Sequence, residues 1–152
     1  LTTRVKDIQL YGQSRPRAIH EQSVTLLLED EIDISRGDMI VASGEAPAQS
    51  KQVEALVCWL SETALSPART YWLRHTTRED KAKVAAIAHR VDINTLANDP
   101  ATTLAMNDIA RVTLKLAQPI FADRYEDSRA TGAFILIDES TNNTVGAGMI
   151  VA

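Results

Sequence analysis

The sequence contains little of what several protein classes require. Its 152 residues include one cysteine, Cys58, which has no second cysteine for an internal disulfide and favours a reducing, cytoplasmic compartment. Six glycines and five prolines are too few for a fibrous or disordered chain. No apolar run approaches the roughly 20 residues of a membrane-spanning helix, and no signal-peptide pattern opens the chain. We therefore expect a globular cytoplasmic protein that does not enter a membrane.

Basic residues are in the minority. Sixteen Lys and Arg residues against twenty Asp and Glu residues give a formal net charge of −4. Non-specific binding to nucleic acid depends on clustered Lys and Arg side chains. No basic run is present, although the composition still allows a local basic patch. The sequence therefore argues against nucleic acid as a partner.

Motifs for catalysis and for cofactors are also missing. No segment matches the G-x-x-x-x-G-K-[ST] loop, in which backbone amides and a lysine hold the phosphates of a nucleotide. His20, His75 and His89 are too scattered for a metal pair, and Cys58 does not join them at a ligand spacing. The Gly-Ala-Gly of residues 146–148 lacks the third glycine of a dinucleotide fingerprint, so we expect a bend or a close backbone approach there. The sequence predicts no catalytic, cofactor-binding or metal-binding residue in this chain.

Strand patterns are what the sequence has instead. Val112, Leu114 and Leu116 lie on one face of an alternating segment, and Val24, Leu26 and Leu28 do the same earlier in the chain. A Ser-Thr-Asn-Asn segment between the last two apolar runs predicts a hairpin. Many short strands separated by turn signals predict an all-β chain of small barrels. The predicted strands are residues 23–29, 38–42, 53–60, 109–116, 132–138 and 144–150.

The remaining segments are less clear. Residues 79–88 are rich in Ala and Lys, which favours a helix, but their apolar residues alternate as in a strand. Both alternatives stay open at this point. Residues 101–107 suggest a short helical turn, and the small, polar residues 43–52 suggest a linker. Gly37, within an Arg-Gly-Asp tripeptide, is expected in a turn with positive φ rather than in a cell-adhesion motif.

Several surface features have both a structural and a functional interpretation. The acidic residues Glu29, Asp30, Glu31 and Asp33 indicate a solvated turn, with docking to a basic partner as the alternative. The aromatic residues and a polar loop could pack within the protein or contact a subunit partner. These residues are Trp59, Tyr71 and Trp72 for the aromatic group, and residues 123–127 with Arg129 and Thr131 for the loop.

Three segments together resemble one known family. Residues 28–38, 129–138 and 141–150 are similar, in this order, to segments of the large, GTP-binding subunit of bacterial sulfate adenylyltransferase. Residues 90–96 and 107–112 also fit, so the resemblance covers essentially the whole chain. That family belongs to the elongation-factor-Tu-like GTPases. Because the chain also opens at Leu1 without a methionine, we expect it to be a carboxy-terminal piece of a longer protein.

The resemblance implies a specific architecture. Residues 1–46 would be the carboxy-terminal half of the domain II β-barrel, and residues 47–152 would be domain III, a six-stranded Greek-key barrel. It also implies that residues 78–90 form a strand. Residues 144–148 resemble the end of domain III of elongation factor Tu, which has an arginine just before them. This chain has Asn143 at that place, which weakens a transfer-RNA-binding interpretation.

The resemblance also implies a function for the parent protein. Its partner would be a small catalytic subunit that makes adenosine 5′-phosphosulfate and pyrophosphate from ATP and sulfate, driven by GTP hydrolysis. GTP and Mg²⁺ would bind the parent's own GTPase domain, which contacts these barrels but lies outside this chain. Unpaired strand edges in a half-length barrel could also produce a homodimer. The alternative is an elongation-factor-like barrel module that binds transfer RNA or another nucleic acid.

Overall fold

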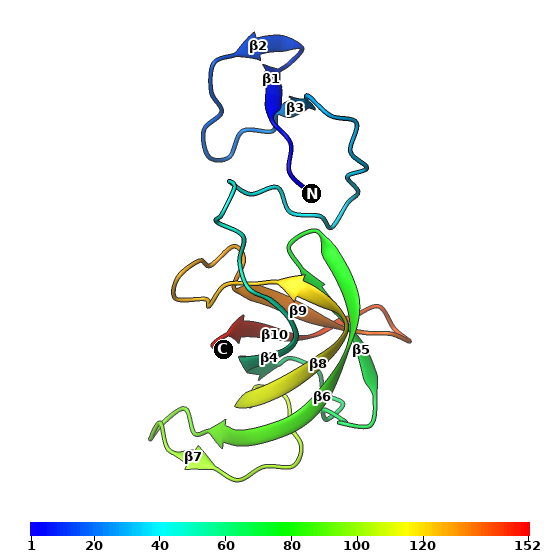
Figure 1. The fold of residues 1–152 in the computed structure, drawn as a ribbon. Helices are drawn as coiled ribbons and strands as arrows, with labels where there is room; N and C mark the ends of the chain where they lie inside the picture. The colour runs from blue at the N-terminus through cyan, green and yellow to red at the C-terminus, as the bar shows by residue number, and fades with distance from the viewer. The chain divides into compact units, whose positions relative to one another are not determined.

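The structure is a computed structural model that describes all residues from 1 to 152. It contains ten β-strands and no helix, so the predicted all-β class is confirmed. No helix is therefore present with the length and hydropathy needed to cross a membrane. The chain divides into two compact units, residues 1–35 and residues 36–152 (Figure 1). The assignment of residues 1–46 and 47–152 to two domains of a parent stays a prediction, since compactness alone does not test it.

The first unit is a small antiparallel sheet. Its strands are β1 (Val5–Leu10), β2 (Gln13–Arg15) and β3 (Thr25–Leu28), arranged in the order β2-β1-β3. Tyr11 and Gly12 join β1 to β2 with φ values of 52° and 75°, as a two-residue hairpin requires. The predicted face of Val24, Leu26 and Leu28 is confirmed, because all three are half-buried while the residues between them are exposed.

The second unit is a closed barrel of six strands. The sheet order is β5-β9-β10-β4-β8-β6, and β6 also pairs with β5, which closes the ring; all pairs are antiparallel. A two-residue strand, β7, pairs with the far end of β6. The strands are β4 (Gln49–Trp59), β5 (Thr70–His75), β6 (Arg78–Val91), β7 (Asn98–Asp99), β8 (Ile109–Phe121), β9 (Ala133–Asp138) and β10 (Thr144–Ile150).

The barrel has Greek-key connectivity. Strands β5, β6 and β8 are neighbours in sequence order, and the chain then crosses back so that β9 lies beside β5. Three successive antiparallel strands and a fourth that returns to the first define this motif. Figure 1 shows β6 as the long curved strand that links the two sides of the ring. The predicted six-stranded Greek-key barrel is therefore confirmed.

Alternation along each strand fills the barrel interior. In β8, the predicted inward residues Val112, Leu114 and Leu116 are all buried. Strand β4 has buried residues at every second position from Val53 to Trp59. Successive side chains of a strand point to opposite faces, so one face of each strand meets the core and the other lies on the barrel exterior.

Tertiary pairing decided the ambiguous segment. Residues 78–91 form the strand β6, as the resemblance implied and against their helix propensity. Ala82 and Val84 are buried in the core, and β6 pairs with β5 on one side and β8 on the other. Hydrogen bonding on both sides outweighs an intrinsic preference of less than about 1 kcal/mol per residue.

Three local predictions were wrong. Residues 38–42 form no strand, because Ile40 and Val41 are exposed and find no partner strand. Residues 101–107 contain bends and a turn but no helix. The predicted linker ends too late, because Gln49 and Ser50 already pair with β8. The polarity of residues 43–52 predicted a loop. The first residues of a strand can nevertheless be polar where the strand extends to the end of the barrel, as Gln49 and Ser50 do.

Candidate protein-interaction surface

The residues considered for chemistry do not come together. His20 is exposed in the first unit and His89 is half-buried in β6, whereas His75 is buried and its Nε2 lies 2.6 Å from the carbonyl oxygen of Thr131. No group of three or more His, Cys, Asp or Glu side chains is placed to hold a metal ion. The acidic turn is exposed, and Asp30 accepts a hydrogen bond from Thr3.

The most unusual surface of the barrel is an apolar outer face. It lies across β8, β4, β10 and β9, where cross-strand register aligns the outward residues in two rows. An outward position on a solvated strand is normally polar, so an apolar row across several strands marks a candidate interaction surface. One row contains Ile109, Cys58, Ala147 and Ile135, and the next contains Leu56, Met149 and Ala133.

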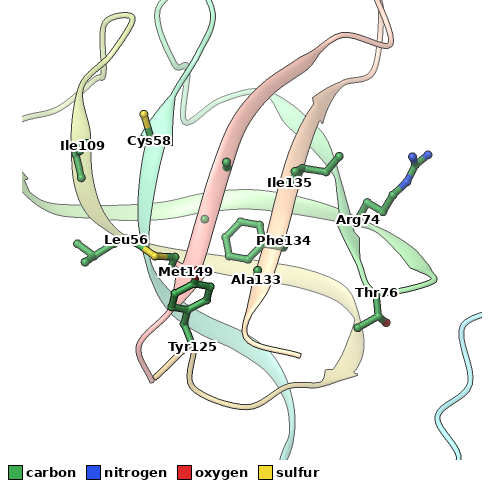
Figure 2. Close-up of a pocket in the computed structure, with 12 residues that line it drawn as sticks. Leu56, Cys58, Arg74, Thr76, Ile109, Tyr125, Ala133, Phe134, Ile135 and Met149 are labelled. Carbon is green, nitrogen blue, oxygen red and sulfur yellow. The ribbon is translucent and has the colours of Figure 1, made fainter. Parts of the chain in front are cut away.

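The apolar outer face, defined by these seven residues, is hollowed. Six of its side chains are half-buried and Met149 is 39% exposed. The hollow has a volume of about 520 Å³. Figure 2 shows the side chains of Leu56 and Met149 close together on neighbouring strands, with Ile135 farther along the same face. The surface could therefore receive an apolar side chain of a partner.

Charged residues border this face, and their charges are already compensated. Arg111 donates from Nε and one Nη to the same carboxylate oxygen of Glu54, at 3.1 and 2.7 Å. Arg74 of β5 lies opposite Ile135, next to the β9 end of the first row, and forms an ion pair with Glu79. A polar rim around an apolar centre is the usual arrangement of a protein interface.

A rigid loop adds an aromatic side chain to the border. Tyr125 lines the hollow, and its backbone amide donates to the carbonyl of Ile150 at 2.8 Å. Gly132 packs so closely against this loop that a Cβ would lie 2.4 Å from the Cα of Tyr125. The Thr131 hydroxyl donates to Asp123 at 2.5 Å. These contacts preorganise the loop, which lowers the entropy lost when a partner binds.

The residues of the loop considered for a partner contact differ in their exposure. The structure places Arg129 in the exposed part of the loop, whereas Thr131 is half-buried and occupied by hydrogen bonds within the protein. Sequence reasoning singled out the loop for its polarity and did not identify Tyr125 as the residue that lines the hollow. Whether the loop contacts a partner stays a prediction.

The three aromatic residues have two different environments. Trp59 and Tyr71 are buried in the core and meet edge to face, with ring centroids 5.6 Å apart at an angle of 79°. The packing interpretation is confirmed for these two. Trp72 instead lies on the outer side of β5, half-buried, with Lys81 Nζ 5.1 Å from its ring centroid. Only Trp72 is positioned for the alternative role at an interface.

The glycine pattern in β10 also has a structural explanation. A Cβ at Gly148 would lie 2.2 Å from the ring of Phe134, which fills the space below the apolar outer face. The predicted close approach is confirmed for this glycine. Gly37 has a φ of 101°, so the predicted turn with positive φ is also confirmed.

Sequence reasoning missed the apolar outer face as a surface. A signal was present, because residues 53–60 are apolar at nearly every position and not only at alternate ones. That pattern indicates a strand buried on both faces. In a closed single-layer barrel the second face points outward, so the same pattern marks an exposed apolar surface.

Comparisons with known proteins agree with this fold. The sequence is 47% identical over 149 residues to a bifunctional enzyme CysN/CysC of Rhodopirellula baltica, matching 98% of this chain and 23% of that protein. It is 43% identical over 150 residues to sulfate adenylyltransferase subunit 1 of Saccharophagus degradans, matching 99% of this chain and 32% of that protein. The predicted resemblance is therefore confirmed, and the chain spans a third or less of the length of these relatives.

A solved structure supports the fold independently of close sequence similarity. Sup35 complexed with GDP superimposes with a TM-score of 0.87 and 19% identity, over 99% of this chain and 37% of that one. A family model described as GTP-eEF1A C-terminal domain-like matches residues 52–151, which cover the strands of the barrel almost completely. The chain thus belongs to the GTP-eEF1A C-terminal domain-like family.

Proposed function

We propose that this chain is the non-catalytic β-barrel region of the GTP-binding large subunit of a sulfate adenylyltransferase. The observation that carries this proposal is the 43–44% identity to proteins named sulfate adenylyltransferase subunit 1 over nearly the whole chain. Relatives named subunit 1 belong to enzymes with at least one further subunit. The partner proposed for this chain is the small catalytic subunit, which forms adenosine 5′-phosphosulfate from ATP and sulfate in the cytoplasm.

The role proposed for the barrel is mechanical rather than chemical. Nucleotide hydrolysis needs a phosphate-binding loop, and the sequence contains none. GTP and Mg²⁺ would therefore bind the GTPase domain of the parent. Movement of that domain with nucleotide state would change its contact with a rigid barrel, and the barrel would pass this change to the catalytic subunit.

The apolar outer face is the proposed contact surface within this assembly. Its apolar centre, compensated rim charges and preorganised Tyr125 loop are the properties of a surface that is covered in the working enzyme. The proposed homodimer and the nucleic-acid alternative have no comparable observation in their favour.

A region exchange tests the proposal. The segment of Saccharophagus degradans subunit 1 that matches this chain is replaced by residues 1–152, in a strain that lacks its own subunit 1. The matched control carries the corresponding barrels of sup35, which share the fold but only 19% of the sequence. We expect growth on sulfate as the sole sulfur source, and GTP-dependent pyrophosphate release in extracts, for the first chimera only.

Two double variants of the working chimera then test the contact surface. Leu56→Asp with Met149→Asp should abolish copurification of the small subunit and growth on sulfate. Ile93→Asp with Leu96→Asp changes two exposed apolar residues elsewhere, which are 67% and 76% exposed, and should leave both unchanged. A chimera that is expressed and folded but releases no pyrophosphate would contradict the proposed function. Equal behaviour of the two double variants would contradict only the contact surface.

A further inference from the structure

A second outer face of the barrel concentrates positive charge. Lys115 of β8 lies directly opposite Lys83 of β6, and Lys83 lies opposite Thr70 of β5. Lys81 is two residues from Lys83 on the same side of β6 and lies opposite Trp72. We name the surface of Lys81, Lys83, Lys115 and Trp72 the lysine face.

The arrangement is unfavourable for the isolated chain. Like charges directly opposite each other on neighbouring strands destabilise a sheet. No carboxylate lies within ion-pair distance of Lys83 or Lys115, and both side chains are exposed. The third lysine is compensated, because Lys81 Nζ lies 2.7 Å from Glu139.

Arg74, Arg90 and Arg111 on the barrel exterior each have a carboxylate partner. Lys51, Arg78 and Arg129 have none, but none of them lies opposite a second Lys or Arg in the strand register, as Lys83 and Lys115 do. The chain has more acidic than basic residues, so partners for two further lysines are available in its composition. An uncompensated cross-strand pair in such a chain marks a place where the negative charge comes from another molecule.

The shape of the surface fits a polypeptide segment. A shallow hollow of about 560 Å³ lies beside the lysines. Small or short side chains such as Ala85, Ala117 and Pro67 line it, so a backbone could approach the strands closely. The three ammonium groups would then lie within reach of carboxylates on that segment.

A nucleic acid fits this surface less well. Single-stranded nucleic acid binds through bases stacked on open aromatic rings. Trp72 is half-buried, and Lys81 already lies against its ring. A phosphate backbone would also extend beyond three lysines onto a chain whose net charge is −4. A short acidic segment would be affected mainly by the local charges, because screening acts over about 8 Å at physiological ionic strength.

We propose that the lysine face docks an Asp- and Glu-rich segment of a partner protein, with Lys83 and Lys115 as its main cationic contacts. This surface lies on β5, β6 and β8, whereas the apolar outer face is centred on β4, β10 and β9. The barrel would thus have two distinct contact surfaces. The inference does not depend on the identity of the parent enzyme.

The test is a titration of the whole chain with a blocked peptide of repeating Glu-Gly-Asp-Gly units, followed by amide chemical shifts in NMR. We expect saturable shifts at Lys81, Lys83 and Lys115 that weaken with added salt. Lys83→Glu with Lys115→Glu should weaken binding at least about tenfold. The matched control, Lys6→Glu with Arg17→Glu, changes the net charge equally at two exposed cations of the first unit and should alter affinity less than about twofold.

Further arms separate the remaining outcomes. Lys83→Gln with Lys115→Gln removes the charges without adding new ones and should weaken binding in the same direction, with thermal melting confirming the fold. Single-stranded oligothymidylate is titrated in parallel. Tighter binding of the oligonucleotide than of the peptide at the lysine face would overturn the proposal in favour of nucleic acid. An absence of shifts with the peptide, or an equal loss in the Lys6/Arg17 control, would overturn it outright.

Discussion

The two compact units are built from similar strands but differ in what those strands enclose. The barrel of residues 36–152 has nineteen residues in one buried core cluster, including Trp59 and Leu114. The sheet of residues 1–35 has no buried side chain, and its best-covered residues, such as Leu26, are only half-buried. Both units show the same alternation of apolar and polar residues.

The difference teaches what alternation does and does not specify. A strand with one apolar face needs a cover for that face, but its own sequence does not supply the cover. In the barrel, closure of the ring places each apolar face against the others. The open sheet of β1, β2 and β3 has no second layer within its own unit, and a three-stranded sheet without one has little stability of its own.

The largest expected effect comes from removing a core side chain. Leu114→Ala should lower the free energy of unfolding by about 2–5 kcal/mol, because Leu114 is fully buried and its loss leaves a cavity. The matched change Leu26→Ala, in the open sheet, should cost less than about 1 kcal/mol. Urea denaturation of both variants measures the difference. Equal losses would show that the sheet contributes as much to the cooperative core as the barrel does.

A crowded glycine should have the next largest effect. Gly148→Ala forces the Phe134 ring to move and should cost about 1–3 kcal/mol. Gly12→Ala in the first unit meets no atom within 4 Å and strains only a backbone with a φ of 75°, so the barrel transition should stay where it is. Thermal melting followed by the fluorescence of Trp59 and Trp72 reports on the barrel, because both tryptophans lie in its strands. A shift of that transition in Gly12→Ala would show that the first unit contributes to the stability of the barrel.

Acid should affect the barrel through the β9–β10 hairpin. The backbone amide of Thr141 donates to Asp138, as does that of Ser140, and the Arg69 guanidinium lies 3.1 Å away. Together these contacts lower the pKa of Asp138 below its usual 3.8, against the opposing effect of burial. A lowered pKa stabilises the folded state above the unfolded pKa, and this contribution is lost as the pH falls through the folded pKa.

Comparison with a variant isolates this carboxylate. Asp138→Asn should be less stable than the wild type at neutral pH, and the difference between the two should shrink as the pH falls below about 4. Melting temperatures measured across the acid range provide the data. A difference that stays constant with pH would mean that the charge of Asp138 does not stabilise the turn.

The smallest effect is expected from removing the open sheet. A chain of residues 36–152 should unfold at the same urea concentration as residues 1–152, because every residue of the core cluster lies within the barrel. The same comparison by hydrogen exchange should show unchanged protection in β4 and β8. A large loss of barrel stability on truncation would contradict the comparison drawn above.

Much of the fold could be predicted from the sequence, for identifiable reasons. Val112, Leu114 and Leu116 alternate without interruption, and the Ser-Thr-Asn-Asn segment separates two apolar runs, so β8 and the last hairpin follow from local pattern alone. Residues 78–90 needed the resemblance, since their composition favours a helix. Residues 38–42 are the opposite case. Their apolar pattern predicts a strand, but they form none because no other strand pairs with them.

The surfaces were much less predictable than the strands. Leu56 and Met149 are ninety-three positions apart by their residue numbers, and only the antiparallel register of β4 and β10 makes them neighbours. Lys83 and Lys115 similarly meet through β6 and β8, and no basic run in the sequence indicates them. Interaction surfaces on a barrel consist of single residues from many strands, which a linear pattern cannot reveal.

The sequence by itself determined the all-β class, the strands β3, β4, β8, β9 and β10, the inward faces of β3 and β8, and the family. These follow from side-chain alternation and from segments that are local in the chain. Only the tertiary structure decided three further features. These are the closure of the ring, the choice between helix and strand that the composition of residues 79–88 left open, and the composition of the apolar outer face and the lysine face. Each of these depends on register between strands distant in sequence, and register is set when the inward residues of all strands pack together in one core.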